Sequence, residues 1–62
     1  MEVVTYSHAR NQLKSVIDRV VKDEDVTIIS RRDAEGNAVL MSENTYNGLM
    51  DTLKQAKKIN LL

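Results

Sequence analysis

The chain has 62 residues, which is enough for one small domain and no more. A domain of this size buries only about 60% of the surface of its unfolded chain and is marginally stable alone. The sequence has no cysteine and one histidine, which excludes disulfides and a structural zinc site as sources of extra stability. Self-association is the remaining source, so we expect a homodimer.

The net charge is zero, because nine Lys and Arg residues balance nine Asp and Glu residues. This balance argues against non-specific polyanion binding, but basic side chains that gather on one surface remain compatible with DNA binding. Acidic residues cluster at 23–25 and at 33 and 35. No apolar segment is long enough to span a membrane, and the N-terminus lacks the apolar region of a signal peptide. We therefore expect a soluble, cytoplasmic protein without a membrane partner.

The first predicted elements are a short β-branched strand over residues 3–6 and a helix from His8 to Val21 or Lys22. Ser7 is the predicted N-cap of this helix, which puts Arg10 in the first turn, where a cation opposes the helix dipole. A helix start of this kind offers amides and a guanidinium to phosphate. One apolar stripe at helical spacing is expected to face the core, formed by Ala9, Leu13, Val16, Ile17 and Val20.

After a polar connection at 22–25, residues 26–31 form the clearest strand, and residues 38–41 form the returning strand of a hairpin. The turn at 33–37 contains Gly36 and Asn37, the two residues most tolerant of positive φ. Ser42 is the predicted N-cap of a second helix. The apolar face of that helix consists of Tyr46, Leu49, Met50, Leu53 and Ala56.

The element order strand, helix, strand, strand, helix predicts an α+β domain, with a three-stranded sheet packed against helices. We expect this domain to cover residues 1–56, followed by a short tail at 57–62. Three apolar residues of the tail have little to pack against in so small a protomer: Ile59, Leu61 and Leu62. They either fray, pack on a second subunit, or begin a longer segment.

Catalysis is not expected. The histidine, His8, is predicted to be an exposed residue of the first helical turn, and no cysteine is present to serve as a nucleophile. The carboxylates fall in the connection and the turn, and neither a phosphate-binding glycine loop nor a metal-ligand spacing occurs. The sequence therefore predicts a protein that is not an enzyme and needs no cofactor or metal.

Arg31 and Arg32 end the strongest strand and have two interpretations. They either block edge pairing and neutralise the carboxylates of the turn, or they join Arg10 on one positive surface. A guanidinium suits the second role because its planar fork can bond phosphate, or the O6 and N7 atoms of guanine, bidentately. Neighbouring polar side chains complete the predicted DNA-binding set: Ser7, Asn11 and Lys14. Tyr6 is expected to be a packed aromatic residue with its hydroxyl at the surface.

The segment Thr5-Tyr6-Ser7-His8-Ala9-Arg10-Asn11-Gln12-Leu13 resembles the opening signature of the Phd/YefM family of type II toxin–antitoxin antitoxins, where a short strand leads into a Ser-x-Ala-Arg-x-x-Leu helix start. Residues 26–31 and 38–42 resemble the second and third strands of the family. Residues 44–49 match its Tyr followed three residues later by Leu. The resemblance covers residues 2–54.

The resemblance implies a homodimer that binds operator DNA upstream of its own operon and represses transcription. The DNA-contacting arginines of the family fall on Arg10 and Arg31 here, whereas Arg32 has no motif match. Family antitoxins also carry a C-terminal segment that folds along a toxin of the RelE/YoeB or Doc type. The present sequence stops near the junction with that segment, so it is either a fragment or a naturally short member.

Two alternatives remain at this point for the C-terminal residues. If the toxin-binding segment begins here, the candidates for toxin contact are Ile59, Leu61 and Leu62. In the alternative, the protein is an interaction module that docks a partner through the apolar end from Leu53 to Leu62, and the arginines only keep it soluble.

Overall fold

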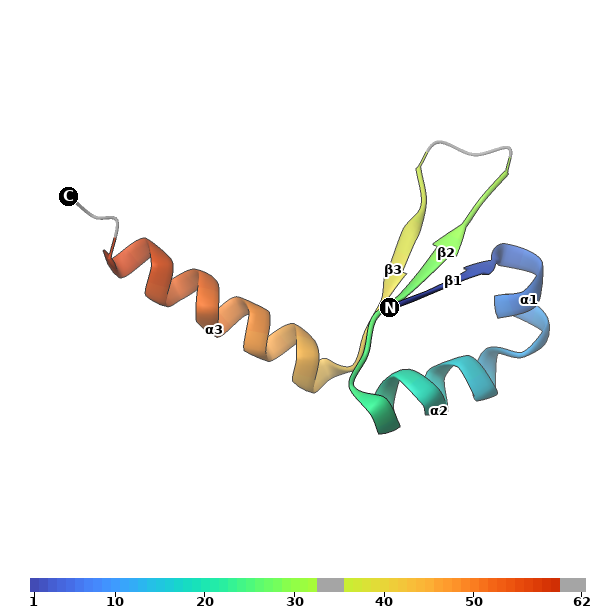
Figure 1. Cartoon of the computed structure of the whole chain (residues 1–62), viewed down its shortest axis with the longest axis horizontal. Coiled ribbons are helices and arrows are strands. Elements are labelled where there is room, and N and C mark those ends of the chain that lie inside the picture. Colours follow the sequence, from blue (N-terminus) through green and yellow to red (C-terminus); the bar gives the residue numbers. More distant parts are fainter. Residues whose placement is uncertain (33–35, 60–62) are drawn as a thin grey trace.

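The computed structural model describes residues 1–32 and 36–59, except for the side chains of residues 58 and 59. The predicted α+β class and the predicted element order are confirmed, although the first helix is divided in two (Figure 1). The elements in chain order are β1 (Glu2–Thr5), α1 (Tyr6–Asn11), α2 (Leu13–Asp23), β2 (Thr27–Ser30), β3 (Ala38–Leu40) and α3 (Glu43–Ile59).

The three strands form one sheet in the order β1-β2-β3. β1 pairs with β2 in parallel, and β2 pairs with β3 antiparallel as the predicted hairpin. A parallel pair needs a crossover connection, and here α1 and α2 supply it. The direction of β1, which the sequence alone did not determine, therefore follows from the helical segment between the two strands.

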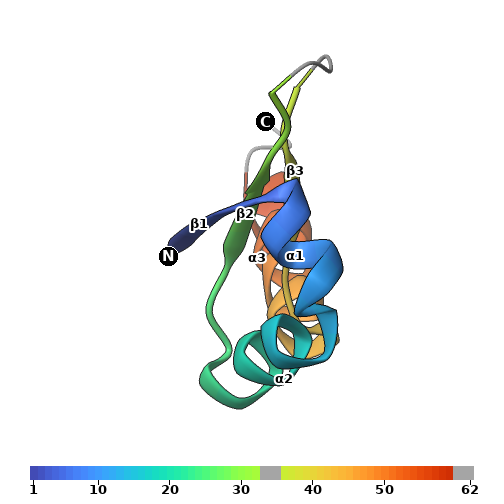
Figure 2. The same ribbon diagram turned by 90° about the vertical axis from the view of Figure 1, so that its right-hand side faces the viewer.

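The two faces of the sheet differ in what covers them. The row that joins Glu2, Thr27 and Leu40 faces α2: Thr27 is buried, and Arg19 of α2 forms an ion pair with Glu2. The next row points the opposite way. It consists of Val3, Ile28 and Val39, which we call the open sheet face. Among the described residues no element covers this face, and Val3 and Val39 remain 63% and 57% exposed (Figure 2).

The core of the protomer is small. Among the described residues the buried apolar side chains are Ala9, Val16 and Val20, all from the predicted stripe. The prediction was wrong for Leu13 and Ile17, which are 48% and 39% exposed. The predicted stripe holds only for one continuous helix. Gln12 has φ −123° and ψ 36°, outside the helical region, and the helix axis changes direction there.

The first helix also begins earlier than predicted. Thr5, not Ser7, is the N-cap of α1: its backbone is extended, and its Oγ1 accepts a hydrogen bond from the His8 amide at 3.1 Å. Ser7 lies inside the helix. Arg10 consequently lies in the last turn of α1, where a cation is favourable to the helix dipole. The predicted loss of helix stability at Arg10 was therefore wrong.

Because the Thr5 hydroxyl is the acceptor in this cap, Thr5→Val should lower the free energy of unfolding by about 1 kcal/mol. Valine keeps the β-branched shape and removes only the hydroxyl. Thr5→Ser should retain most of the stability, and Ser7→Ala should change it by less than about 0.5 kcal/mol. Urea unfolding at one fixed protein concentration measures all three, and a larger loss for Ser7→Ala than for Thr5→Val would contradict this assignment.

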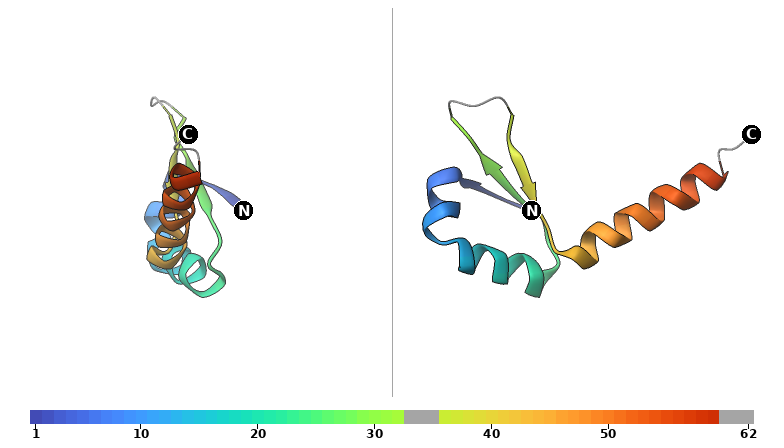
Figure 3. Two further views of the ribbon diagram at one scale, coloured as in Figure 1. Left: turned by 90° about the vertical axis from the view of Figure 1, so that its left-hand side faces the viewer. Right: turned by 180° about the vertical axis from the view of Figure 1, so that it is seen from behind.

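α3 begins as predicted, with Ser42 as its cap. The Thr45 amide donates to Ser42 Oγ at 3.0 Å. Thr45 Oγ1 donates to the carbonyl of Glu24, and Asn44 donates to the Glu24 side chain, so the start of α3 is attached to the connection after α2. From there α3 extends away from the sheet, which gives the molecule its long dimension of 47 Å (Figure 3). The predicted boundary between residues 56 and 57 falls inside this helix.

The same connection holds the N-terminus. The amino group of Met1 donates to Asp25 Oδ2 at 2.9 Å, and the Val26 amide donates to Asp25 Oδ1 at 2.7 Å. The bond from the amino group, followed by the bond from Val26, lowers the pKa of Asp25 below its usual 3.8. A carboxylate whose pKa is lower in the folded state stabilises the fold above its unfolded pKa.

This contribution should be constant between pH 5 and 7 and should disappear as the pH falls below about 4, through the lowered pKa of Asp25. The difference in unfolding free energy between the wild type and Asp25→Asn, measured by urea unfolding across this range, should show that profile. Acetylation of the Met1 amino group removes the charged donor and should reduce the difference at pH 6. A difference that grows toward low pH would contradict the assignment.

Candidate nucleic-acid interface

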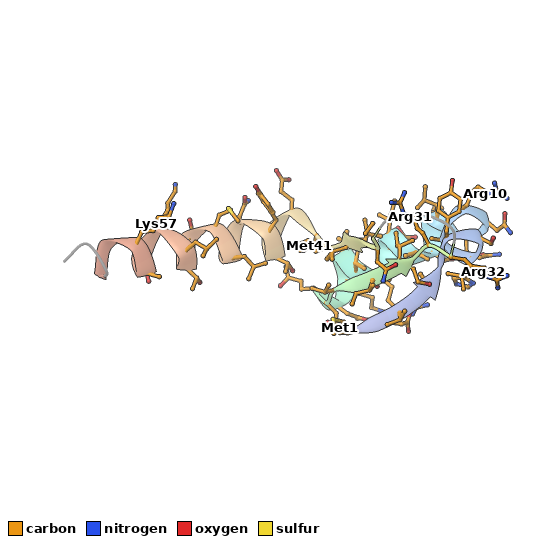
Figure 4. The ribbon with its side chains drawn as sticks, turned by 90° about the horizontal axis from the view of Figure 1, so that it is seen from above. Met1, Arg10, Arg31, Arg32, Met41 and Lys57 are labelled. Carbon is orange, nitrogen blue, oxygen red and sulfur yellow. The ribbon has the colours of Figure 1, made fainter. Side chains whose placement is uncertain are left out.

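The three predicted arginines lie at one end of the molecule. Arg10 comes from α1, and Arg31 and Arg32 follow directly after β2. Figure 4 shows all three at the end opposite Lys57, which lies on α3. All three are exposed. The fold therefore brings together residues that are about 20 positions apart in the sequence, as the second interpretation of the arginine pair required.

Arg31 and Arg32 lie on different sides of this end. Side chains alternate along an extended chain, and Ser30 belongs to the side of the open sheet face. The next residue, Arg31, accordingly lies on the same side as Arg10, and Arg32 lies on the other side (Figure 4). Arg10 and Arg31 thus share one side of this end, whereas Arg32 lies on the other.

Arg31 is fixed in place by the hairpin. Its amide donates to Asn37 Oδ1 at 3.2 Å, and its Nε donates to the carbonyl of Gly36 at 3.1 Å. Gly36 has φ +83°, as predicted for the turn, whereas Asn37 does not take positive φ and contributes its side chain instead. The remainder of the predicted turn, residues 33–35, lies outside the described residues. The hairpin therefore determines where the Arg31 side chain leaves the sheet.

Arg10 is held by an aromatic ring. Its Cζ lies 5.8 Å from the centroid of the Tyr6 ring, within the range of a cation–π contact. Tyr6 is 51% exposed, so the ring is only half-packed. Sequence reasoning missed this pair because the helix was predicted to begin at His8. With Tyr6 inside α1, the two residues are four positions apart, a spacing that places them on one helix face.

The other predicted DNA contacts differ in their surroundings. Ser7 and Asn11 are exposed on α1. Lys14 is exposed on α2, but its Nζ donates to Asp18 Oδ2 at 2.9 Å. The hydrogen bond to Asp18, followed by the attraction of its negative charge, raises the pKa of Lys14. The Asp18 charge offsets that of Lys14, which makes Lys14 a weaker candidate for phosphate than Arg10.

Charge is unevenly distributed along the first half of the chain, although the total is neutral. Residues 5–17 contain Arg10 and Lys14 and no carboxylate. Residues 18–25 contain four carboxylates and two cations, Arg19 and Lys22, and three of the carboxylates form the acidic cluster at the connection before β2. The connection lies at the far end of α2 from α1 (Figure 1). A neutral chain can thus present a basic end to a polyanion.

The C-terminal candidates are only partly described. Ile59 is the last residue of α3, and Leu61 and Leu62 lie outside the described residues. In the N-terminal part of α3 an apolar row is about half exposed; it consists of Tyr46, Leu49 and Leu53. The spacing of three and four residues places this row on one face of α3.

No group of acidic, histidine or cysteine side chains suited to a metal ion is found within residues 1–32 and 36–59. Over the same residues, no helix is both long and apolar enough to cross a bilayer.

The family model of the Phd_YefM antitoxins of type II toxin–antitoxin systems matches residues 1–60. Curated protein sequences give no match. Among solved structures, the operator DNA complex of the antitoxin Phd from phage P1 has 26% identity and a TM-score of 0.85, covering 100% of this chain and 98% of that one.

Two structures of YoeB–YefM complexes are more similar in sequence. A heterohexameric complex bound to 26-bp DNA has 37% identity and a TM-score of 0.79, covering 87% of this chain and 98% of that one. A heterotetrameric complex from Staphylococcus aureus has 39% identity and a TM-score of 0.78, covering 87% of this chain. The present chain spans 64% of that second chain, just under two thirds of its length.

Proposed function

Since the chain belongs to the Phd/YefM family of type II toxin–antitoxin antitoxins, we propose that it is a homodimeric, sequence-specific repressor of its own operon. The observation that carries the proposal is the common position of Arg10 and Arg31 at one exposed end of the protomer. The phage P1 relative, similar over the whole of this chain, is bound to an inverted repeat of operator DNA.

Arg10 and Arg31 have the central role in this interface. Each guanidinium can bond one phosphate, or the O6 and N7 atoms of one guanine, through two parallel hydrogen bonds. Asn11 follows Arg10 on α1 and supplies an amide suited to the N6 and N7 atoms of adenine. Ser7 and Lys14 contact phosphates at the edge of the interface. Arg32, on the other side of the hairpin, contributes charge but no base contact.

Dimerisation follows from the small core and the open sheet face. Val3, Ile28 and Val39 form an apolar row across all three strands, which a second protomer would remove from water. A two-fold dimer presents two copies of the Arg10 and Arg31 pair. Such a pair of sites matches an inverted repeat whose half-sites are about one helical turn apart.

The test is binding of the purified protein to a duplex taken from immediately upstream of its gene. By fluorescence anisotropy at fixed salt, this duplex should bind at least about 10³-fold more tightly than a shuffled duplex of equal length and composition. The protein should bind as a dimer, with one or more dimers for each inverted repeat. Equal affinity for both duplexes would contradict sequence-specific repression.

We propose further that α3 belongs to the toxin-binding side of the molecule. The support is the exposed apolar row Tyr46, Leu49 and Leu53 on α3. This helix extends away from the sheet (Figure 3). The proposed contact continues through Ile59, Leu61 and Leu62 to a toxin of the RelE/YoeB or Doc type. The S. aureus relative forms a heterotetramer with YoeB.

Removal of residues 57–62 separates these roles. A pull-down of the toxin encoded beside the gene should weaken without these residues, while operator affinity should stay within about twofold. If operator affinity is lost and toxin capture is unchanged, the division of roles is contradicted. If a protein partner is captured and no DNA is bound by the full chain, the interaction-module alternative replaces repression. Under repression and under the interaction-module alternative alike, we propose that the protein acts by binding in the cytoplasm and not by catalysis.

A further inference from the structure

The contact between Tyr6 and Arg10 has a consequence for DNA binding. Both residues belong to α1 and lie one helical turn apart, with the guanidinium carbon 5.8 Å from the ring centroid. The ring face carries partial negative charge, which attracts the cation and favours orientations in which the guanidinium lies over the ring. An arginine side chain in solution samples many rotamers, and an adjacent ring reduces that freedom before any ligand binds.

The position of Tyr6 does not suit a purely structural role. The buried apolar residues of the described chain come from other positions, Ala9, Val16 and Val20, whereas Tyr6 is 51% exposed. It is also the first residue of α1, immediately after the Thr5 cap, so its backbone position is fixed by the helix start. A half-exposed ring at a fixed position is suited to orienting a neighbouring flexible side chain.

We propose that Tyr6 is a positioning residue that preorganises Arg10 for DNA, and this inference rests on the proposed repressor function. The ring holds the guanidinium over α1, so the planar fork reaches a phosphate or a guanine edge with less loss of side-chain entropy. The aromatic ring, not the tyrosine hydroxyl, performs this role. The effect of Tyr6 on DNA affinity therefore depends on the presence of Arg10.

The test is a double-mutant cycle with the upstream duplex, read by fluorescence anisotropy. Tyr6→Leu should weaken binding about threefold to tenfold, and Tyr6→Phe, which keeps the ring, should restore affinity to within about twofold of the wild type. In the Arg10→Ala background, Tyr6→Leu should have no further effect. Equal losses for Tyr6→Phe and Tyr6→Leu, or a full Tyr6→Leu loss in the absence of Arg10, would overturn the proposal.

A measurement on the free protein covers the case in which Tyr6→Leu fails to fold. The Arg10 side-chain protons of the wild type and of Tyr6→Phe should show an upfield ring-current shift by NMR. Random-coil shifts for Arg10 in the wild type would overturn the positioning role.

The failure of the repressor function and the failure of the Tyr6 role can be distinguished. If the wild type does not recognise the upstream duplex, repression fails and this inference with it. If the wild type binds and Tyr6→Leu binds equally well, only the role of Tyr6 is lost.

Discussion

Replacing both Arg10 and Arg31 by alanine is expected to abolish specific binding to operator DNA. A bidentate arginine contact to a base contributes about 1–3 kcal/mol, so the double variant should lose about 2–6 kcal/mol for each protomer of the dimer if the contacts are independent. The two residues lie on the same side of one end of the protomer, and both are exposed. Neither is part of the core, so the thermal unfolding temperature should change little.

The single variants distinguish the kinds of contact. If Arg31 reads a base edge, Arg31→Ala should relax specificity at one position of the half-site. If Arg31 contacts a phosphate, the loss should be similar for all sequences, and the slope of log K against log salt should fall by about one for each protomer of the dimer. A panel of duplexes with one base pair changed at a time, titrated at several salt concentrations, separates the two.

Lys57→Ala is the matched control, because it removes the same unit charge at the opposite end of the molecule (Figure 4). Its effect on operator affinity should be less than about twofold at physiological salt, where distant charges are screened. An equal loss for Lys57→Ala and Arg10→Ala would indicate that net charge alone governs binding. Unchanged affinity in the double arginine variant would contradict the proposed interface.

The second large effect is expected at the open sheet face. Val39→Glu should dissociate the dimer, because it replaces an apolar contact of about 1.5–3 kcal/mol by a carboxylate that costs several kcal/mol to bury unpaired. Val39 lies in the same row as Ile28 and Val3 and is 57% exposed in the protomer. Sedimentation velocity at micromolar concentrations should change from dimer to monomer, and operator affinity should fall with it.

The thermal stability of Val39→Glu should fall as well, because few apolar side chains are buried within the described part of the protomer. The unfolding temperature of the wild type should rise with protein concentration, as for any dimer whose dissociation is coupled to unfolding. Ser15→Glu adds the same charge at an exposed position of α2 and serves as the control. A Val39→Glu protein that remains dimeric, with the same unfolding temperature as Ser15→Glu, would contradict dimerisation through this face.

Local patterns predicted much of the fold. Alternating and β-branched residues predicted the strands to within one or two residues, and Ser42 predicted the start of α3 correctly. The start of the first helix was predicted two residues late. Thr5 and Ser7 are both good caps, and a hydroxyl pattern cannot distinguish them until the end of β1 is known. This error also concealed the spacing between Tyr6 and Arg10.

The break at Gln12 had no local signal, since no proline or glycine occurs there. It lies in the crossover between the parallel strands β1 and β2, which α1 and α2 form together. Leu13 and Ile17, which follow the break, are exposed. The helical spacing of apolar residues predicts which side chains share a face of a straight helix. It does not indicate where the helix axis changes direction.

By itself, the sequence determined the α+β class and the hairpin, because these depend on neighbours within a few positions. It also indicated residue types suited to the proposed interface. The Ser-x-Ala-Arg-x-x-Leu signature also indicated the family, which the match over residues 1–60 confirms. Only the tertiary structure decided which arginines lie together. The parallel pairing of β1 with β2 brings the end of β2 beside the start of α1, and strand alternation then places Arg31, and not Arg32, on the side of Arg10.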